Sequence, residues 1–183
     1  MMEHYSDNKL LELFREDESR NYAFNLIVRK YQERIYWHIR RMVISHEDAD
    51  DVVQNTLVKV WKGLHRFKGE SQLYTWMYRI ATNETITFLN KKRKRFFISL
   101  NDIESELEQT LTSSEGFTGD EIQLKLQKAL LTLPEKQRLV FNMKYFDELK
   151  FAEISEILGT SIGALKASYH LAAKKIEAHL KSH

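Results

Sequence analysis

The chain has 183 residues, of which 43% are hydrophobic and 30% charged, and its formal net charge is +2. One proline and six glycines favour helices over hairpins, which need more turn residues, and the absence of cysteine excludes disulfides and thiolate chemistry. No apolar run reaches the length of a membrane span and the N-terminus lacks a signal-peptide pattern, so we expect a cytoplasmic protein without membrane insertion.

The charges divide the chain into three parts. Residues 1–97 hold 18 Lys and Arg against 13 Asp and Glu, residues 98–121 hold no base and seven acids, and residues 122–183 hold ten bases and six acids. The net charges are therefore +5, −7 and +4. Residues 98–120 also lose the apolar periodicity, as linkers do. We predict an all-α protein with two small helical domains, 1–97 and 121–183, which are independent and joined by an acidic flexible linker, 98–120.

Three helices are predicted before residue 65, over residues 6–16, 22–43 and 47–64, because apolar residues recur there at helical spacing. The third begins with a cluster of acids, which suits the positive end of a helix dipole. Its side away from the apolar face carries Asp51, Gln54, Asn55 and Val58. Val58 is an apolar residue among polar ones and indicates a docking surface. Acids this close together are common at helix starts, so a metal site is disfavoured.

A fourth helix is predicted over residues 71–94, after a polar turn, Lys68–Ser71. Tyr74, Tyr78 and Thr82 form a second stripe on it, and five cations, Lys91–Arg95, end it. The stripe could pack on another helix. Beside a glycine turn and a cationic tail it favours a platform for unstacked bases. The alternative is that Ser71 caps the helix and Gly69 eases the turn.

Helices are predicted in the C-terminal part over residues 122–131, 134–146, 151–158 and 162–180. The last two flank a Gly159-Thr160-Ser161 turn, which is the helix-turn-helix arrangement, although any amphipathic helical pair can produce this pattern. Ser161 is expected to cap the final helix, and Ile162, Leu165, Tyr169, Ala172 and Ile176 to form its inner face.

Together these segments resemble an extracytoplasmic-function (ECF) sigma factor, the smallest kind of bacterial RNA polymerase sigma subunit. Residues 1–97 resemble sigma region two through Asp48–Gln54, Val60-Trp61, Phe67–Ser71 and Thr75–Asn83. Residues 121–183 resemble region four through Leu133–Arg138, Glu153-Ile154, Gly159 and Gly163–Lys166. The match covers nearly the whole chain, and the order and spacing of the fragments make it specific.

The resemblance implies three binding surfaces. Polymerase core would be bound by Asp48, Asp51, Gln54, Asn55 and Val58. The minus-ten element would be bound by Phe67, Lys68, Gly69, Glu70, Ser71, Tyr74, Arg79, Asn83, Lys91, Lys92 and Arg93. The minus-thirty-five element would be bound by Ser161, Gly163, Ala164, Lys166, Ala167, Ser168, His170, Leu171 and Lys174. The loop 67–71 would hold a flipped base, while Trp61 and Trp76 would stay in the core.

The resemblance also implies the partners: bacterial RNA polymerase core, promoter DNA and an anti-sigma factor. We expect no enzyme activity, cofactor, metal or small-molecule substrate, since the sequence has no phosphate-binding glycine loop, no His-Glu-x-x-His and no thiol. A stand-alone helix-turn-helix regulator is the alternative.

The recognition helix departs from the family's usual sequence, because Ala164, Ala167, Leu171 and Ala173 replace polar side chains that the family often has. Base reading would then rest on Lys166, Ser168, His170, methyl contacts or DNA shape.

Overall fold

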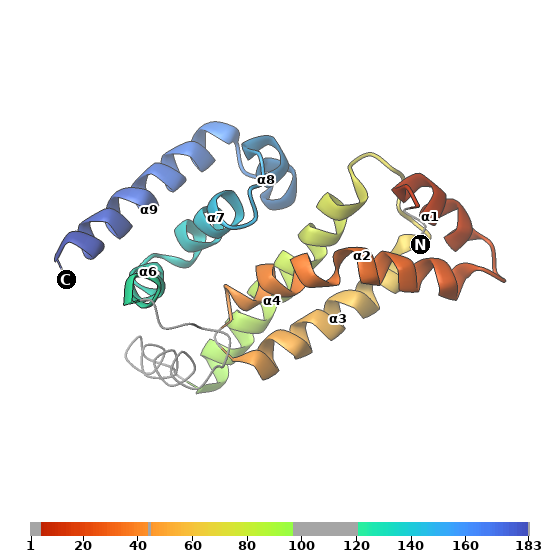
Figure 1. Ribbon diagram of the computed structural model, residues 1–183, viewed down its shortest axis with the longest axis horizontal. Coiled ribbons are helices and arrows are strands. Elements are labelled where there is room, and N and C mark those ends of the chain that lie inside the picture. The colour runs from red at the N-terminus through yellow and green to blue at the C-terminus, as the bar shows by residue number, and fades with distance from the viewer. Residues whose placement is uncertain (1–4, 44, 97–120, 183) are drawn as a thin grey trace.

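The computed structural model describes residues 5–43, 45–96 and 121–182, and every regular element in these ranges is a helix. The helices are α1 (Asp7–Arg15), α2 (Arg20–Arg40), α3 (His46–Leu64), α4 (Leu73–Phe96), α6 (Glu121–Leu131), α7 (Glu135–Tyr145), α8 (Phe151–Leu158) and α9 (Ile162–Ser182) (Figure 1). The all-α prediction is confirmed, and the predicted helix ends differ from the observed ones by a few residues. The predicted linker, 98–120, lies outside the described residues.

Helices α1 to α4 form the N-terminal domain. Figure 1 shows α2, α3 and α4 side by side, with α1 at one end. Serine side chains start two of these helices: Ser6 accepts a hydrogen bond from the backbone amide of Lys9, and Ser45 accepts one from that of Asp48. Trp61 packs edge-on against Phe14 and Phe24, with ring centroids 5.3 and 4.9 Å apart.

Trp76 fills the space beside Gly63. A Cβ atom on Gly63 would lie 3.1 Å from the Trp76 ring, which is tighter than ordinary contact, so this approach of α3 and α4 favours a glycine. Both Trp61 and Trp76 therefore pack against the core, as predicted. None of the helices in the described ranges combines the length and apolar character needed to cross a bilayer.

Helices α6 to α9 form the C-terminal domain, in which α6, α7 and α9 share a buried apolar cluster. The predicted helix-turn-helix is present in α8 and α9. Gly159 ends α8 in the left-handed conformation, with φ +63°, and the Ser161 hydroxyl accepts a hydrogen bond from the Ala164 amide at the start of α9. Ile162, predicted on the inner face of α9, is 42% exposed, since the buried positions of that helix begin at Leu165.

The two domains share one buried apolar cluster, which the sequence analysis did not predict. Leu139, Val140 and Met143 of α7 and Ile154 and Ile157 of α8 belong to the same cluster as the core of α1 to α4. Figure 1 shows α8 lying against α4. The expectation of two independent domains is therefore wrong in this structure, because apolar residues of α7 and α8 are buried against the N-terminal domain.

Candidate polymerase and nucleic-acid interfaces

The outer face of α3, defined here as Asp51, Gln54, Asn55 and Val58, is exposed as predicted. Val58 is 50% exposed, whereas Val52, Thr56 and Val60 on the opposite side of the helix are buried. No hydrogen bond or ion pair within the described ranges engages the four side chains of the outer face. The structure thus presents an apolar side chain surrounded by carboxylate and amide groups, a combination suited to binding another protein.

Asp48, also predicted to bind polymerase, lies in a different environment. Its carboxylate pairs with the ammonium group of Lys92 on α4, with 2.6 Å between Oδ2 and Nζ. Both residues are half-buried. The structure therefore joins a predicted polymerase-binding residue to a predicted DNA-binding one, and this pair fixes the start of α3 against the later part of α4.

The turn between α3 and α4 borders a cavity of about 520 Å³, which lies within the size range of ligand pockets. Phe67, Gly69, Glu70 and Ser71 line it, and the exposed Lys68 does not. Gly69 has φ +75°, a conformation in which a side chain would be strained. The Phe67 ring is held by Trp76, with centroids 5.3 Å apart.

Ser71 does not cap α4. The helix begins at Leu73, and the Trp76 amide donates to the backbone carbonyl of Gln72. In the described part of the chain, no hydrogen bond engages the side chains of Glu70, Ser71 or Gln72. The capping alternative is therefore unsupported, and the polar groups beside the cavity are available to a ligand.

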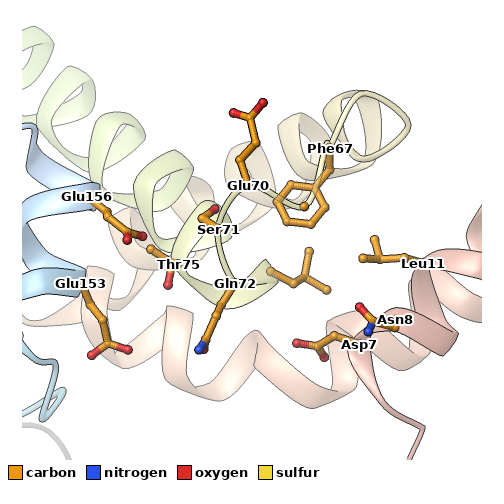
Figure 2. A pocket seen from close by; sticks show the side chains of 12 residues that line it. Asp7, Asn8, Leu11, Phe67, Glu70, Ser71, Gln72, Thr75, Glu153 and Glu156 are labelled. Carbon is orange, nitrogen blue, oxygen red and sulfur yellow. The ribbon is translucent and has the colours of Figure 1, made fainter.

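The cavity also has walls that the sequence analysis missed. Asp7, Asn8 and Leu11 of α1 line one side, and Glu153 and Glu156 of α8 line the other (Figure 2). These residues belong to no sequence motif that would identify them as part of a binding site. They come together only because the fold brings the first helix and the helix-turn-helix unit to the same turn.

The predicted aromatic platform is wrong for two of its three members. Tyr78 and Thr82 are buried, because α2 covers this side of α4. The Tyr78 hydroxyl donates to the Arg34 carbonyl at 3.1 Å. Tyr74 remains half-buried. Its hydroxyl donates to the Glu153 carboxylate, and burial, followed by this hydrogen bond, raises the pKa of Tyr74 to about 12.

A buried polar cluster holds the two domains together. His38 is 0% exposed, with Nδ1 2.8 Å from Oδ2 of Asp147 and Nε2 2.9 Å from Oγ1 of Thr82. The other carboxylate oxygen of Asp147 accepts a hydrogen bond from Arg41, and the Asp147 side chain is 3% exposed. One residue of the C-terminal domain therefore contacts both His38 of α2 and Arg41, which directly follows that helix.

Other predicted minus-ten residues have different surroundings. Arg93 donates to Glu135 on α7, with 2.5 Å between Nη2 and Oε2, so it joins Tyr74 as a contact between the domains. Arg79, Asn83 and Lys91 are exposed. Arg138, near the Arg93–Glu135 pair, is largely buried, and this burial lowers its pKa.

The outward side of α9 matches the predicted recognition surface. Seven of the nine predicted residues lie exposed along the helix: Gly163, Ala164, Lys166, Ala167, His170, Leu171 and Lys174. Ser168 is half-buried, and the Ser161 hydroxyl is used as the helix cap. The face is therefore mostly small and apolar, with Lys166, His170 and Lys174 as its exposed cationic or titratable groups. Within the described ranges, no group of three His, Asp or Glu side chains is arranged to hold a metal ion.

Comparison with known proteins identifies both domains. Residues 27–95 match the family described as Sigma-70 region 2, and residues 123–176 match Sigma-70, region 4. The chain is 31% identical over 170 residues to the ECF RNA polymerase sigma factor SigW of Bacillus subtilis, covering 87% of this chain and 89% of the relative. It is 29% identical over 196 residues to the RNA polymerase sigma-H factor of Pseudomonas aeruginosa, covering 99% and 97%.

Solved structures show the same fold. The sigma factor RpoE in complex with the anti-sigma factor NepR from Bartonella quintana matches with a TM-score of 0.70 and 22% identity, over 86% of this chain and 96% of that one. CnrH in complex with the cytosolic domain of CnrY matches with a TM-score of 0.70 and 21% identity, over 96% and 97%. The sequence match to SigW and the matches of both domains agree with the motifs read from the sequence, and this chain belongs to the family of ECF RNA polymerase sigma factors.

Proposed function

We propose that the chain binds bacterial RNA polymerase core and directs it to promoters, where it helps to open the DNA by capturing an unpaired base of the minus-ten element. The observation that carries this proposal is the cavity beside the Phe67–Ser71 turn, where no hydrogen bond in the described part of the chain engages the Glu70 and Ser71 side chains. The turn directly joins α3, with its exposed outer face, to α4, so core binding and base capture are mechanically linked.

The proposed mechanism makes and breaks no covalent bond. Taking a base out of the duplex costs roughly a few kcal/mol. Stacking of a base on an aromatic side chain returns about 1–3 kcal/mol. Phe67 supplies the aromatic ring and the turn supplies polar contacts, so capture of a base offsets the cost of unstacking it.

The outer face of α3 is the proposed core-binding surface. Val58 is 50% exposed, and Asp51, Gln54 and Asn55 on the same face provide groups that form hydrogen bonds. Desolvation of a central apolar side chain inside a polar rim is how protein interfaces gain much of their free energy.

The outward side of α9 is the proposed minus-thirty-five surface. Lys166 and His170 can reach base edges, Lys174 suits a phosphate, and Ala164, Ala167 and Leu171 offer only apolar contacts. Recognition by this face would therefore depend more on backbone contacts, thymine methyl groups and DNA shape than on many hydrogen bonds to bases.

The packed arrangement of the domains is proposed to be a state that promoter DNA must displace. Displacement would remove the α8 wall of the cavity and leave the Phe67–Ser71 turn and α1 to hold the base. Tyr74 and Arg93, both proposed minus-ten contacts, are bound to Glu153 and Glu135 of the C-terminal domain. The similar sigma factor RpoE was solved in complex with the anti-sigma factor NepR. This supports the further proposal that an anti-sigma factor binds this chain.

Replacing Lys68–Ser71 with the corresponding turn of a relative tests base capture. We expect the change to leave core binding intact and to alter the preferred minus-ten base, because the polar groups at the cavity would differ. The measurement is transcription by the holoenzyme from a promoter library randomised in the minus-ten element. An even loss of activity across the library, with the preferred base unchanged, would show that the turn is only a hinge.

A further inference from the structure

Helix α1 supplies one wall of the proposed base pocket. Asn8 and Leu11 lie on the side of the cavity away from Glu153 and Glu156 of α8, and Ser71 lies between the two groups (Figure 2). The region of the chain that matches Sigma-70 region 2 begins only at residue 27, so this wall lies outside the matched domain. The pocket is therefore formed by α1 as well as by the Phe67–Ser71 turn on which the proposed function rests.

The position of α1 is fixed by contacts on both sides of Asn8. The preceding residue, Asp7, accepts a hydrogen bond from the Tyr31 hydroxyl at 2.7 Å and pairs with the Lys30 ammonium group at 2.7 Å. Leu10 and Phe14, on the next turns, are buried in the core. Asn8 is thus presented to the cavity from a helix that is anchored at its start and along its inner face.

The polar groups that line the two walls are not equivalent. Asp7 is occupied by Tyr31 and Lys30, and Glu153 by Tyr74 and by the backbone amide of Lys150. By contrast, no hydrogen bond in the described part of the chain engages the Asn8 carboxamide. This group is exposed and retains both its donor and its acceptor for a ligand.

The surroundings of Asn8 suit a nucleobase. Phe67, Leu11 and Leu73 give the cavity an aromatic ring and aliphatic surface, which can contact the flat face of a base. A carboxamide can donate to and accept from the edge of the same base, as asparagine does when it reads adenine in DNA. Apolar walls and an unused carboxamide at the rim together supply both kinds of contact.

We infer that Asn8 is a specificity-determining residue of this pocket and reads an edge of the captured base from the side opposite the Lys68–Ser71 turn. The inference rests on the proposed function, because it assumes that the cavity holds a flipped promoter base. It adds that helix α1, and not the turn alone, selects which base is held.

The test uses the full-length chain in holoenzyme with RNA polymerase core and a promoter library randomised in the minus-ten element. Asn8→Ala should reduce the preference for the best base at the captured position by about tenfold, the effect of losing a good side-chain pairing with a base. Asn8→Asp should shift the preference away from thymine, because a carboxylate only accepts hydrogen bonds and thymine alone among the four bases has no amino group to donate one. Asn25→Asp, at an exposed position of α2 that does not line the cavity, is the matched control and should leave the preference unchanged.

The outcomes separate this inference from the proposed function. If both Asn8 variants keep the preference of the unmodified chain while replacement of Lys68–Ser71 changes it, base capture stands and the role of Asn8 is wrong. If neither the Asn8 variants nor the replaced turn changes the preference, base capture by this pocket is wrong as well. An equal loss of transcription from all promoters in Asn8→Ala, with core binding retained, would also overturn the inference, since it would assign Asn8 a structural role.

Discussion

The double substitution Asp51→Arg and Val58→Glu is expected to abolish binding to RNA polymerase core while the helix content of the chain stays unchanged. Both side chains are exposed on the outer face of α3, and neither supports the fold through a hydrogen bond or ion pair in the described ranges. Central interface residues each contribute about 2 kcal/mol or more, so the pair should weaken binding by roughly a thousandfold. Titration of labelled core with the chain gives the affinity, and circular dichroism gives the helix content.

A matched control changes the same kinds of residue elsewhere. Glu18 and Tyr22 are exposed, four positions apart, near the start of α2, and Tyr22 is 54% exposed. Glu18→Arg with Tyr22→Glu should bind core normally. Unchanged core affinity in the Asp51→Arg, Val58→Glu chain would show that α3 does not contact polymerase through this face.

Asp147→Ala is expected to shift the chain from the packed arrangement toward one in which the domains are separated. The substitution leaves His38 and Arg41 without their shared carboxylate at a site where the ring of His38 is fully buried. Breaking a buried ion pair costs about 3 kcal/mol or more, which changes the ratio of packed to separated molecules by roughly a hundredfold.

Energy transfer between two dyes measures this change. The chain has no cysteine, so Glu33→Cys on α2 and Lys136→Cys on α7 place one dye on each domain at exposed positions. Transfer should fall in Asp147→Ala and stay high in Glu148→Ala, which removes the neighbouring exposed carboxylate. Equal transfer in both variants would show that the His38–Asp147–Arg41 cluster does not hold the domains together.

The helices and the helix-turn-helix could be predicted because their signals are local. Apolar spacing fixes the faces of each helix, and Gly159 with Ser161 fixes the turn between α8 and α9. The outer face of α3 was also predictable, because Val58 is an apolar residue on the polar side of that helix and therefore does not point into the core of its own domain.

The misassigned residues depend on contacts between segments far apart in the chain. Tyr78 and Thr82 have the spacing of an exposed stripe, but α2 covers them. His38 and Asp147 are polar residues separated by 109 positions, and nothing local marks them as buried partners. The packing of the two domains was therefore not predictable from periodicity or charge.

The pocket shows the same division between local and distant signals. Phe67, Gly69 and Ser71 were expected to line a site because the contiguous turn that they form between two helices resembles the base-holding loop of sigma region two. Asn8 was not, because it enters the site through the packing of α1 on α2, which depends on the contact of Asp7 with Tyr31. Residues that form a site within one turn can be predicted from the sequence, whereas the residues of the opposite wall can be identified only from the folded structure.

Transcription by bacterial RNA polymerase core from a fully randomised promoter library, with and without this chain, tests the central claim most directly. We predict that the chain makes initiation selective, and that the selected promoters share two elements, one at the minus-ten and one at the minus-thirty-five position. Selection of a single DNA site by the chain alone, without binding to core and without new initiation, would contradict the claim and would be the behaviour of a stand-alone helix-turn-helix regulator.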